Sequence, residues 1–131
     1  MRAAALLAVA AALVAGTGIA AAKPQAAPHR VQARGLEFDL LLSKARMRPG
    51  RAIVQFLNAG EDAHNLRLQR VDASGAPAGP ELGVGEVEPG AYENIDAHLR
   101  KRSTYVLWCS LQDHRARGME AFLRTRRHRH G

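Results

Sequence analysis

After the first 22 positions, the apolar residues of this chain come in short runs separated by turn-forming residues. These runs are no longer than seven residues, and no stretch keeps a helical period for three turns. Pro-Gly or Asn-x-Gly sequences lie between them. Short runs with such boundaries are typical of β-strands. The pattern predicts an all-β domain, folded as an antiparallel β-sandwich. The runs are 36–42, 52–57, 103–109 and 121–125; the turns are Arg48-Pro49-Gly50, Asn58-Ala59-Gly60 and Glu88-Pro89-Gly90.

Two further segments are less distinct. Residues 72–80 are rich in Ser, Gly and Pro, which predicts a loop. Residues 96–102 are compatible with a helical turn and with a strand.

The N-terminus has the layout of a secretory signal peptide. Arg2 supplies a positive charge, residues 3–15 are uninterrupted apolar sequence, and Ala20-Ala21-Ala22 offers a small-residue cleavage site. We therefore predict a signal peptide over 1–22 and an exported protein, secreted or held in the periplasm or cell envelope. The alternative is an uncleaved membrane anchor, because 3–22 has the ~20 uncharged residues that span a bilayer.

The remaining residues suffice for one domain. Residues 23–34 contain two prolines and several small residues, and predict a flexible lead-in. The domain is expected over 35–126, and 127–131 form a basic tail. The formal net charge of +7 indicates an acidic partner. Nucleic acid is not expected, because no aromatic-basic platform accompanies the charge.

The segment after the third apolar run carries three residues with metal-binding side chains. Cys109 is the only cysteine of the chain, and His114 and Met119 follow it at equal spacing. A single thiol in an exported protein is unusual, and is either an inert buried group, a metal ligand or a nucleophile. A cysteine hydrolase would not need the methionine.

Thiolate, imidazole and thioether together favour copper, since zinc rarely takes methionine. A trigonal His₂Cys site with a weak axial Met needs a second histidine. His64 is the better candidate, because it lies in a loop that can reach the same end of a sandwich as Cys109. His98 is the alternative.

These residues resemble motifs of the cupredoxin family. Asn58-Ala59-Gly60 followed by His64-Asn65 is similar to the family's N-x-G…H-N segment, and Tyr105-x-Leu107-Trp108-Cys109-Ser110 to its strand before the cysteine ligand. The Cys-x₄-His-x₄-Met spacing resembles the rusticyanin and sulfocyanin types. The resemblance spans roughly 36–126. It implies a Greek-key sandwich with one type 1 copper per chain, bound by His64, Cys109 and His114 with Met119 as axial ligand. It also implies that Asn65 braces the two ligand loops.

From this resemblance we expect a monomeric one-electron carrier rather than an enzyme. Its partner would be an acidic redox protein, which meets a positive rim formed by Arg115 and Arg117. The alternative function is a copper carrier or chaperone that transfers the ion itself.

Overall fold

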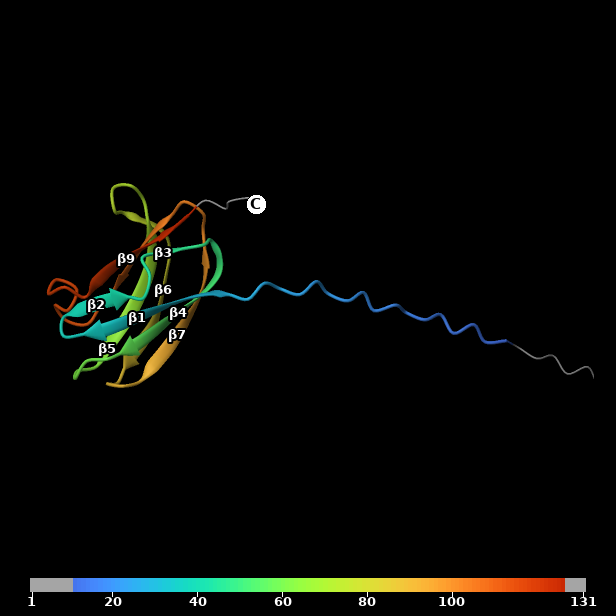
Figure 1. Ribbon diagram of the computed structural model, residues 1–131, viewed down its shortest axis with the longest axis horizontal. Coiled ribbons are helices and arrows are strands. Elements are labelled where there is room, and N and C mark those ends of the chain that lie inside the picture. Colours follow the sequence, from blue (N-terminus) through green and yellow to red (C-terminus); the bar gives the residue numbers. More distant parts are fainter. Residues whose placement is uncertain (1–10, 127–131) are drawn as a thin grey trace, which may run out of the picture.

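The computed structural model describes residues 11–126, and this part of the chain contains nine strands and no helix (Figure 1). Residues 11–28 precede the first strand without secondary structure. No helix in the described range is long and apolar enough to cross a membrane. The basic tail predicted over 127–131 lies outside the described residues, as does the start of the predicted signal peptide. The strands are β1 (His29–Leu36), β2 (Asp39–Leu42), β3 (Arg46–Met47), β4 (Gly50–Asn58), β5 (His64–Val71), β6 (Pro77–Val87), β7 (Tyr92–Leu99), β8 (Thr104–Trp108) and β9 (Glu120–Thr125).

The strands form two sheets that pack face to face, which confirms the predicted β-sandwich. One sheet has the order β2-β1-β4-β7 and the other β3-β9-β8-β5-β6. Several neighbours in space are not consecutive in the chain, as in a Greek key. The sheets are mixed rather than purely antiparallel, since β1 pairs with β4 and β3 with β9 in parallel. The sequence pattern predicted antiparallel sheets. Parallel neighbours need a crossover connection, which local runs and turns do not reveal.

The first strand begins earlier than the sequence suggested. Residues 29–34, predicted as part of a flexible lead-in, belong to β1 and pair with β4 from Ala52 onward. Val31 and Ala33 alternate with more exposed residues and are buried in the core. The strand pairs with β4, which is distant in the chain. The composition of residues 29–34 alone therefore did not reveal that they form a strand.

Two other segments are also strands. Residues 77–80, predicted as loop, form the first part of β6, which returns along β5. Residues 96–99, which the sequence left open, belong to β7 and pair with β4.

The core lies between the two sheets. Alternate side chains of β4 point inward, so that Val54 and Phe56 are fully buried. They pack in one cluster with Leu66 and Leu68 of β5 and Leu107 of β8. This core is apolar and continuous, and supports the loops at either end of the sandwich.

The strands bring distant polar residues to one end. β1 ends just before Glu37, β5 begins at His64, and β8 ends just before Cys109. The loop 109–119 then leads back into β9.

Candidate metal centre

The loop 109–119 is held in shape by its own backbone. The amide of Cys109 donates a hydrogen bond to the carbonyl of Met119 (3.1 Å). The amide of Met119 donates one to the carbonyl of His114 (3.0 Å). Gly118 has a φ of +127°, a conformation that side chains with a β-carbon rarely adopt. A β-carbon there would also lie 2.6 Å from the carbonyl oxygen of Phe38. The loop therefore places its three candidate ligands in a defined arrangement.

Three of the four predicted ligands come together with their donor atoms facing one another. The Nδ1 atoms of His64 and His114 are 3.2 Å apart, and the Cys109 Sγ is 3.5 Å from the His114 Nδ1. All three donor atoms lie within 4.8 Å of one another. Donors bound to one shared ion at about 2.0–2.3 Å, with angles of about 100–120°, would be separated by about 3.1–3.8 Å. The two closest separations fit a single metal ion.

The cluster is shielded from water. His64 and Cys109 are completely buried, and His114 is 7% exposed. Burying two imidazoles and a thiol is costly unless their polar atoms have partners. A soft or borderline metal ion satisfies this set of donors.

Met119 is completely buried at the end of the same loop. Its Cε would lie 3.3 Å from a β-carbon at Gly35, so the glycine leaves room for the methionine side chain. The position fits the predicted role of Met119, which remains a prediction.

His98, the alternative second histidine, is exposed on β7. It pairs with Arg51, near the start of β4, and is not part of the cluster. The structure therefore brings His64 rather than His98 to Cys109.

Glu37 also belongs to this site, although the sequence did not point to it. Its Oε1 lies 2.6 Å from the Nε2 of His64. The same carboxylate accepts hydrogen bonds from the backbone amides of Glu61 and Asp62, both at 2.9 Å. These two amides, with a further contribution from His64, lower the pKa of Glu37 to about 2. A carboxylate held ionised in this way accepts the Nε2–H of His64 and leaves the Nδ1 lone pair for a metal.

The loop before His64 is shaped around this carboxylate. A β-carbon at Gly60 would lie 2.2 Å from the Glu37 Oε1, so a larger residue there would displace this carboxylate. The one signal in the sequence was an acidic residue inside the apolar run 36–42, and nothing in the sequence connected it with His64.

Asn65 links the two ligand segments, as the family resemblance predicted. Its Nδ2 donates to the Ser110 Oγ (2.8 Å), and its Oδ1 accepts the Ser110 amide (2.7 Å). Because Asn65 follows His64 and Ser110 follows Cys109, this pair fixes the distance between two candidate ligands.

The two arginines predicted to form a positive rim are both engaged. The Nε of Arg115 lies 2.5 Å from the Glu120 Oε2, and its guanidinium lies over the Trp108 ring. Arg117 stacks on the Phe38 ring at 3.7 Å, and Phe38 packs against His114. The arginines thus cover the aromatic residues beside the cluster. We call this end of the sandwich, formed by Glu37, His64 and the loop 109–119, the metal end.

Solved structures show that the chain has the cupredoxin fold. Auracyanin from the photosynthetic bacterium Roseiflexus castenholzii, in a dithionite-reduced state, matches with a TM-score of 0.58 and 18% identity over 76% of this chain and 98% of its own. Reduced rusticyanin matches with a TM-score of 0.55 and 19% identity, over 73% of this chain and 77% of its own. A multicopper oxidase matches with a TM-score of 0.51 and 18% identity, over 73% of this chain and 41% of its own. Comparison of the sequence with protein-family models and with curated proteins finds no match.

Proposed function

We propose that this protein is an electron carrier that binds one copper ion in a type 1 site. The observation that carries the proposal is the buried cluster of His64 Nδ1, Cys109 Sγ and His114 Nδ1 within 4.8 Å. When bound, copper would supply a one-electron Cu(II)/Cu(I) couple. Met119 would be the weak axial ligand.

The chain's own residues support electron transfer rather than ion delivery. Glu37 orients His64, and Asn65 ties His64 to the cysteine loop. Backbone hydrogen bonds hold Cys109, His114 and Met119 relative to one another. Donors held in this way would change position little between the Cu(II) and Cu(I) states. A small rearrangement would make electron transfer fast.

An enzyme is not favoured. The cluster is almost completely buried, and four ligands from the protein would leave no position for a substrate. Among the similar structures, auracyanin and rusticyanin are matched over 98% and 77% of their own length, whereas the multicopper oxidase is matched over only 41% of its own.

Export is part of the proposal. It is supported by the charge and apolar pattern of residues 1–22 and by the exposure of 11–22 outside the sandwich. The basic chain would donate electrons to an acidic redox protein, or accept electrons from it.

The test is the absorption spectrum of the purified protein after addition of Cu(II). We expect an intense visible band from thiolate-to-copper charge transfer, which a mild reductant bleaches and an oxidant restores over many cycles. A Cu(I) chelator should remove the metal slowly. Rapid transfer of Cu(I) to the chelator would instead support the copper carrier, and the absence of a visible band would contradict the type 1 site.

A further inference from the structure

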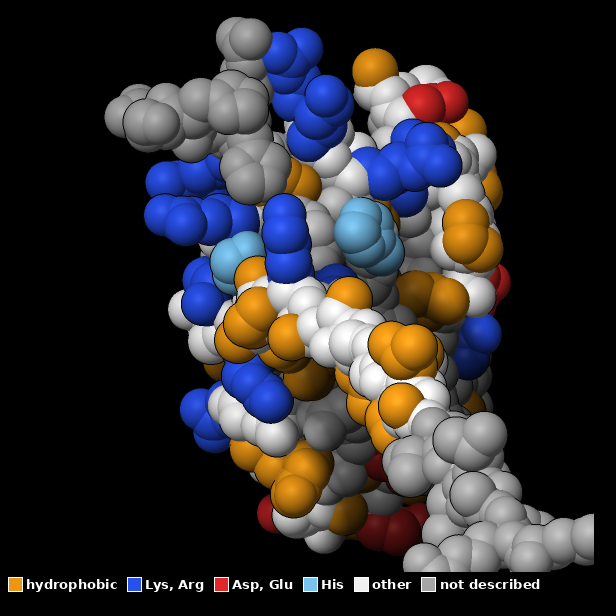
Figure 2. Space-filling model, turned by 90° about the vertical axis from the view of Figure 1, so that its right-hand side faces the viewer, with side chains coloured by type: hydrophobic (Ala, Val, Ile, Leu, Met, Phe, Trp, Pro, Cys, Tyr) orange, Lys and Arg blue, Asp and Glu red, His pale blue; other side chains and the backbone are white. Residues whose placement is uncertain are grey.

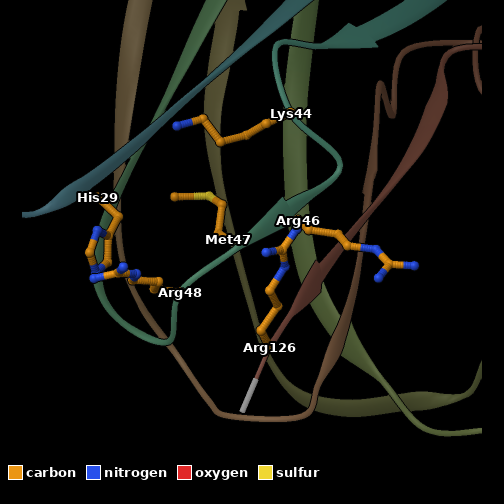
Figure 3. A pocket seen from close by; sticks show the side chains of 6 residues that line it. All are labelled: His29, Lys44, Arg46, Met47, Arg48 and Arg126. Carbon is orange, nitrogen blue, oxygen red and sulfur yellow. The ribbon is translucent and has the colours of Figure 1, made fainter. Parts of the chain in front are cut away.

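A second polar site lies at the end of the sandwich opposite the metal end. It is a pocket of about 310 Å³ lined by five basic side chains and one methionine. Met47 is buried and forms its apolar floor. In Figure 3, four basic side chains surround Met47, whereas the guanidinium of Arg46 points away from it. The lining residues are His29, Lys44, Arg46, Met47, Arg48 and Arg126.

The strands place this pocket far from the metal end. β1 starts at His29 in the pocket and ends beside Glu37, while β9 starts beside Met119 and ends just before Arg126. A strand of six residues spans about 20 Å. The pocket and the candidate metal ligands therefore lie at opposite ends of these strands, and neither site includes a residue of the other. Figure 1 shows how β1 and β9 run from one end of the sandwich to the other.

The pocket concentrates positive charge. The ion pairs found among residues 11–126 are His64–Glu37, Arg67–Glu81 and Arg115–Glu120, and none involves a residue that lines the pocket. Figure 2 looks onto this side, where Lys and Arg side chains gather over the upper half and acidic ones lie at the margins. Four permanent cations around one pocket repel each other, and an anion bound among them would relieve that repulsion.

The chemistry of the lining selects the kind of anion. Arg48 and Arg126 offer guanidinium groups that can hold two oxygens of one phosphate, and Lys44 adds a point charge. His29 adds a ring N–H donor. The concave shape allows several donors to reach one small group, as a flat basic surface would not.

We propose that this pocket binds a phosphate group, either in the headgroup of an anionic lipid or in a soluble phosphate. The site is independent of copper binding. Both sources present the same tetrahedral oxyanion. A protein held by this pocket would leave its metal end on the far side, free to meet a redox partner.

The test compares two double variants of the full chain with the same change in charge. Arg48→Glu with Arg126→Glu reverses two charges of the pocket. Arg34→Glu with Arg124→Glu reverses two exposed arginines that lie on β1 and β9 but do not line it. Both variants should keep the circular dichroism of the wild type, and the visible band if copper binds.

Binding is measured in two arms. Titration calorimetry with inorganic phosphate reports a soluble ligand. Sedimentation with phosphatidylcholine vesicles, with and without phosphatidylglycerol, reports a lipid headgroup and separates it from association through the N-terminal segment.

We expect the pocket variant to lose about tenfold or more of the affinity in at least one arm, and the control variant about twofold or less. If the pocket variant loses affinity for the vesicles alone, the ligand is the lipid headgroup. If the pocket variant loses affinity for inorganic phosphate, the pocket binds a soluble phosphate as well. The proposal is overturned if neither probe binds the wild type, or if both variants lose affinity equally, since net charge alone would then account for binding.

Discussion

At the metal end, the polar side chains of the cluster are buried and each has a partner. In the basic pocket, at the other end of the sandwich, the charged side chains are exposed and form no ion pair with the residues that the structure describes. Among the described residues, no buried side-chain nitrogen or oxygen lacks a hydrogen-bond partner. His64 illustrates the first arrangement, with one ring nitrogen on Glu37 and the other facing His114. Arg48 and Arg126 illustrate the second.

The difference shows two ways of preparing a protein for a ligand. Buried donors must be positioned before the ligand arrives, because an unpartnered polar group costs free energy in the interior. Exposed cations remain hydrated and act through charge, so their effect falls as salt rises. Mutations at the metal end should therefore change a spectrum or an affinity sharply, and changes elsewhere should be milder.

The largest effect is expected from Cys109→Ser. The visible copper band should disappear, because the thiolate is its source, while the fold should remain, because the apolar core does not depend on the ion. Absorption and circular dichroism measure the two. His64→Ala should also abolish the band, and His98→Ala serves as the control that keeps it. A Cys109→Ser chain that unfolds would mean that the metal holds the fold together, as in structural zinc sites.

Glu37→Gln should give the next largest effect. Loss of the negative charge weakens the orientation of His64, and changes at such outer partners typically lower metal affinity by about 10–100-fold. Competition with a copper chelator measures the affinity, and the nitrogen NMR shifts of the metal-free His64 ring report its tautomer. Glu120→Gln is the matched control, since this carboxylate also lies at the metal end but contacts Arg115. Equal losses in both variants would show that Glu37 contributes only general negative charge.

Gly118→Ala tests the rigidity of the ligand loop. The residue needs a positive φ, and a β-carbon would approach the Phe38 carbonyl closely. We expect a loss of about 1–3 kcal/mol in the free energy of unfolding of the metal-free chain. Gly85→Ala is the control, because a β-carbon there meets no atom within 4 Å and the backbone is not in the left-handed region. Similar stability of the two variants would indicate that the loop can relax.

The smallest effect is expected from Asp72→Ala, in the turn where β5 runs away from the metal end. The Asp72 Oδ1 accepts hydrogen bonds from the Ser74 hydroxyl (2.6 Å) and from the amides of Ser74 and Ala76. The loss in the free energy of unfolding should be smaller than that of Gly118→Ala, because these hydrogen bonds are exposed to water.

The pH dependence of this variant provides its own check. The Ser74 hydroxyl and these amides lower the pKa of Asp72 below its usual 3.8. Its contribution to the free energy of unfolding is therefore complete above pH 3.8, the usual pKa that applies in the unfolded chain. The contribution is lost as the pH falls through the lower pKa of the folded chain. Denaturant titrations should show the wild type and Asp72→Ala converging in strongly acidic solution, and a constant difference would contradict the assignment.

The sequence by itself indicated several of the strands and three of the four candidate ligands. Strands β4 and β8 were visible as the runs 52–57 and 103–109, because apolar runs and turn residues are local properties of the chain. Cys109, His114 and Met119 were visible for the same reason, since one loop carries all three.

Only the tertiary structure decided what depends on pairing between distant segments. It selected His64 over His98, placed Glu37 against His64 across 27 positions, and made a strand of residues 29–34 by pairing them with β4. It also assembled the basic pocket from the start of β1, the segment 44–48 and the end of β9. Such contacts arise because strands bury their apolar faces on partners far away in the chain, and no local pattern of residue types records which partner that will be.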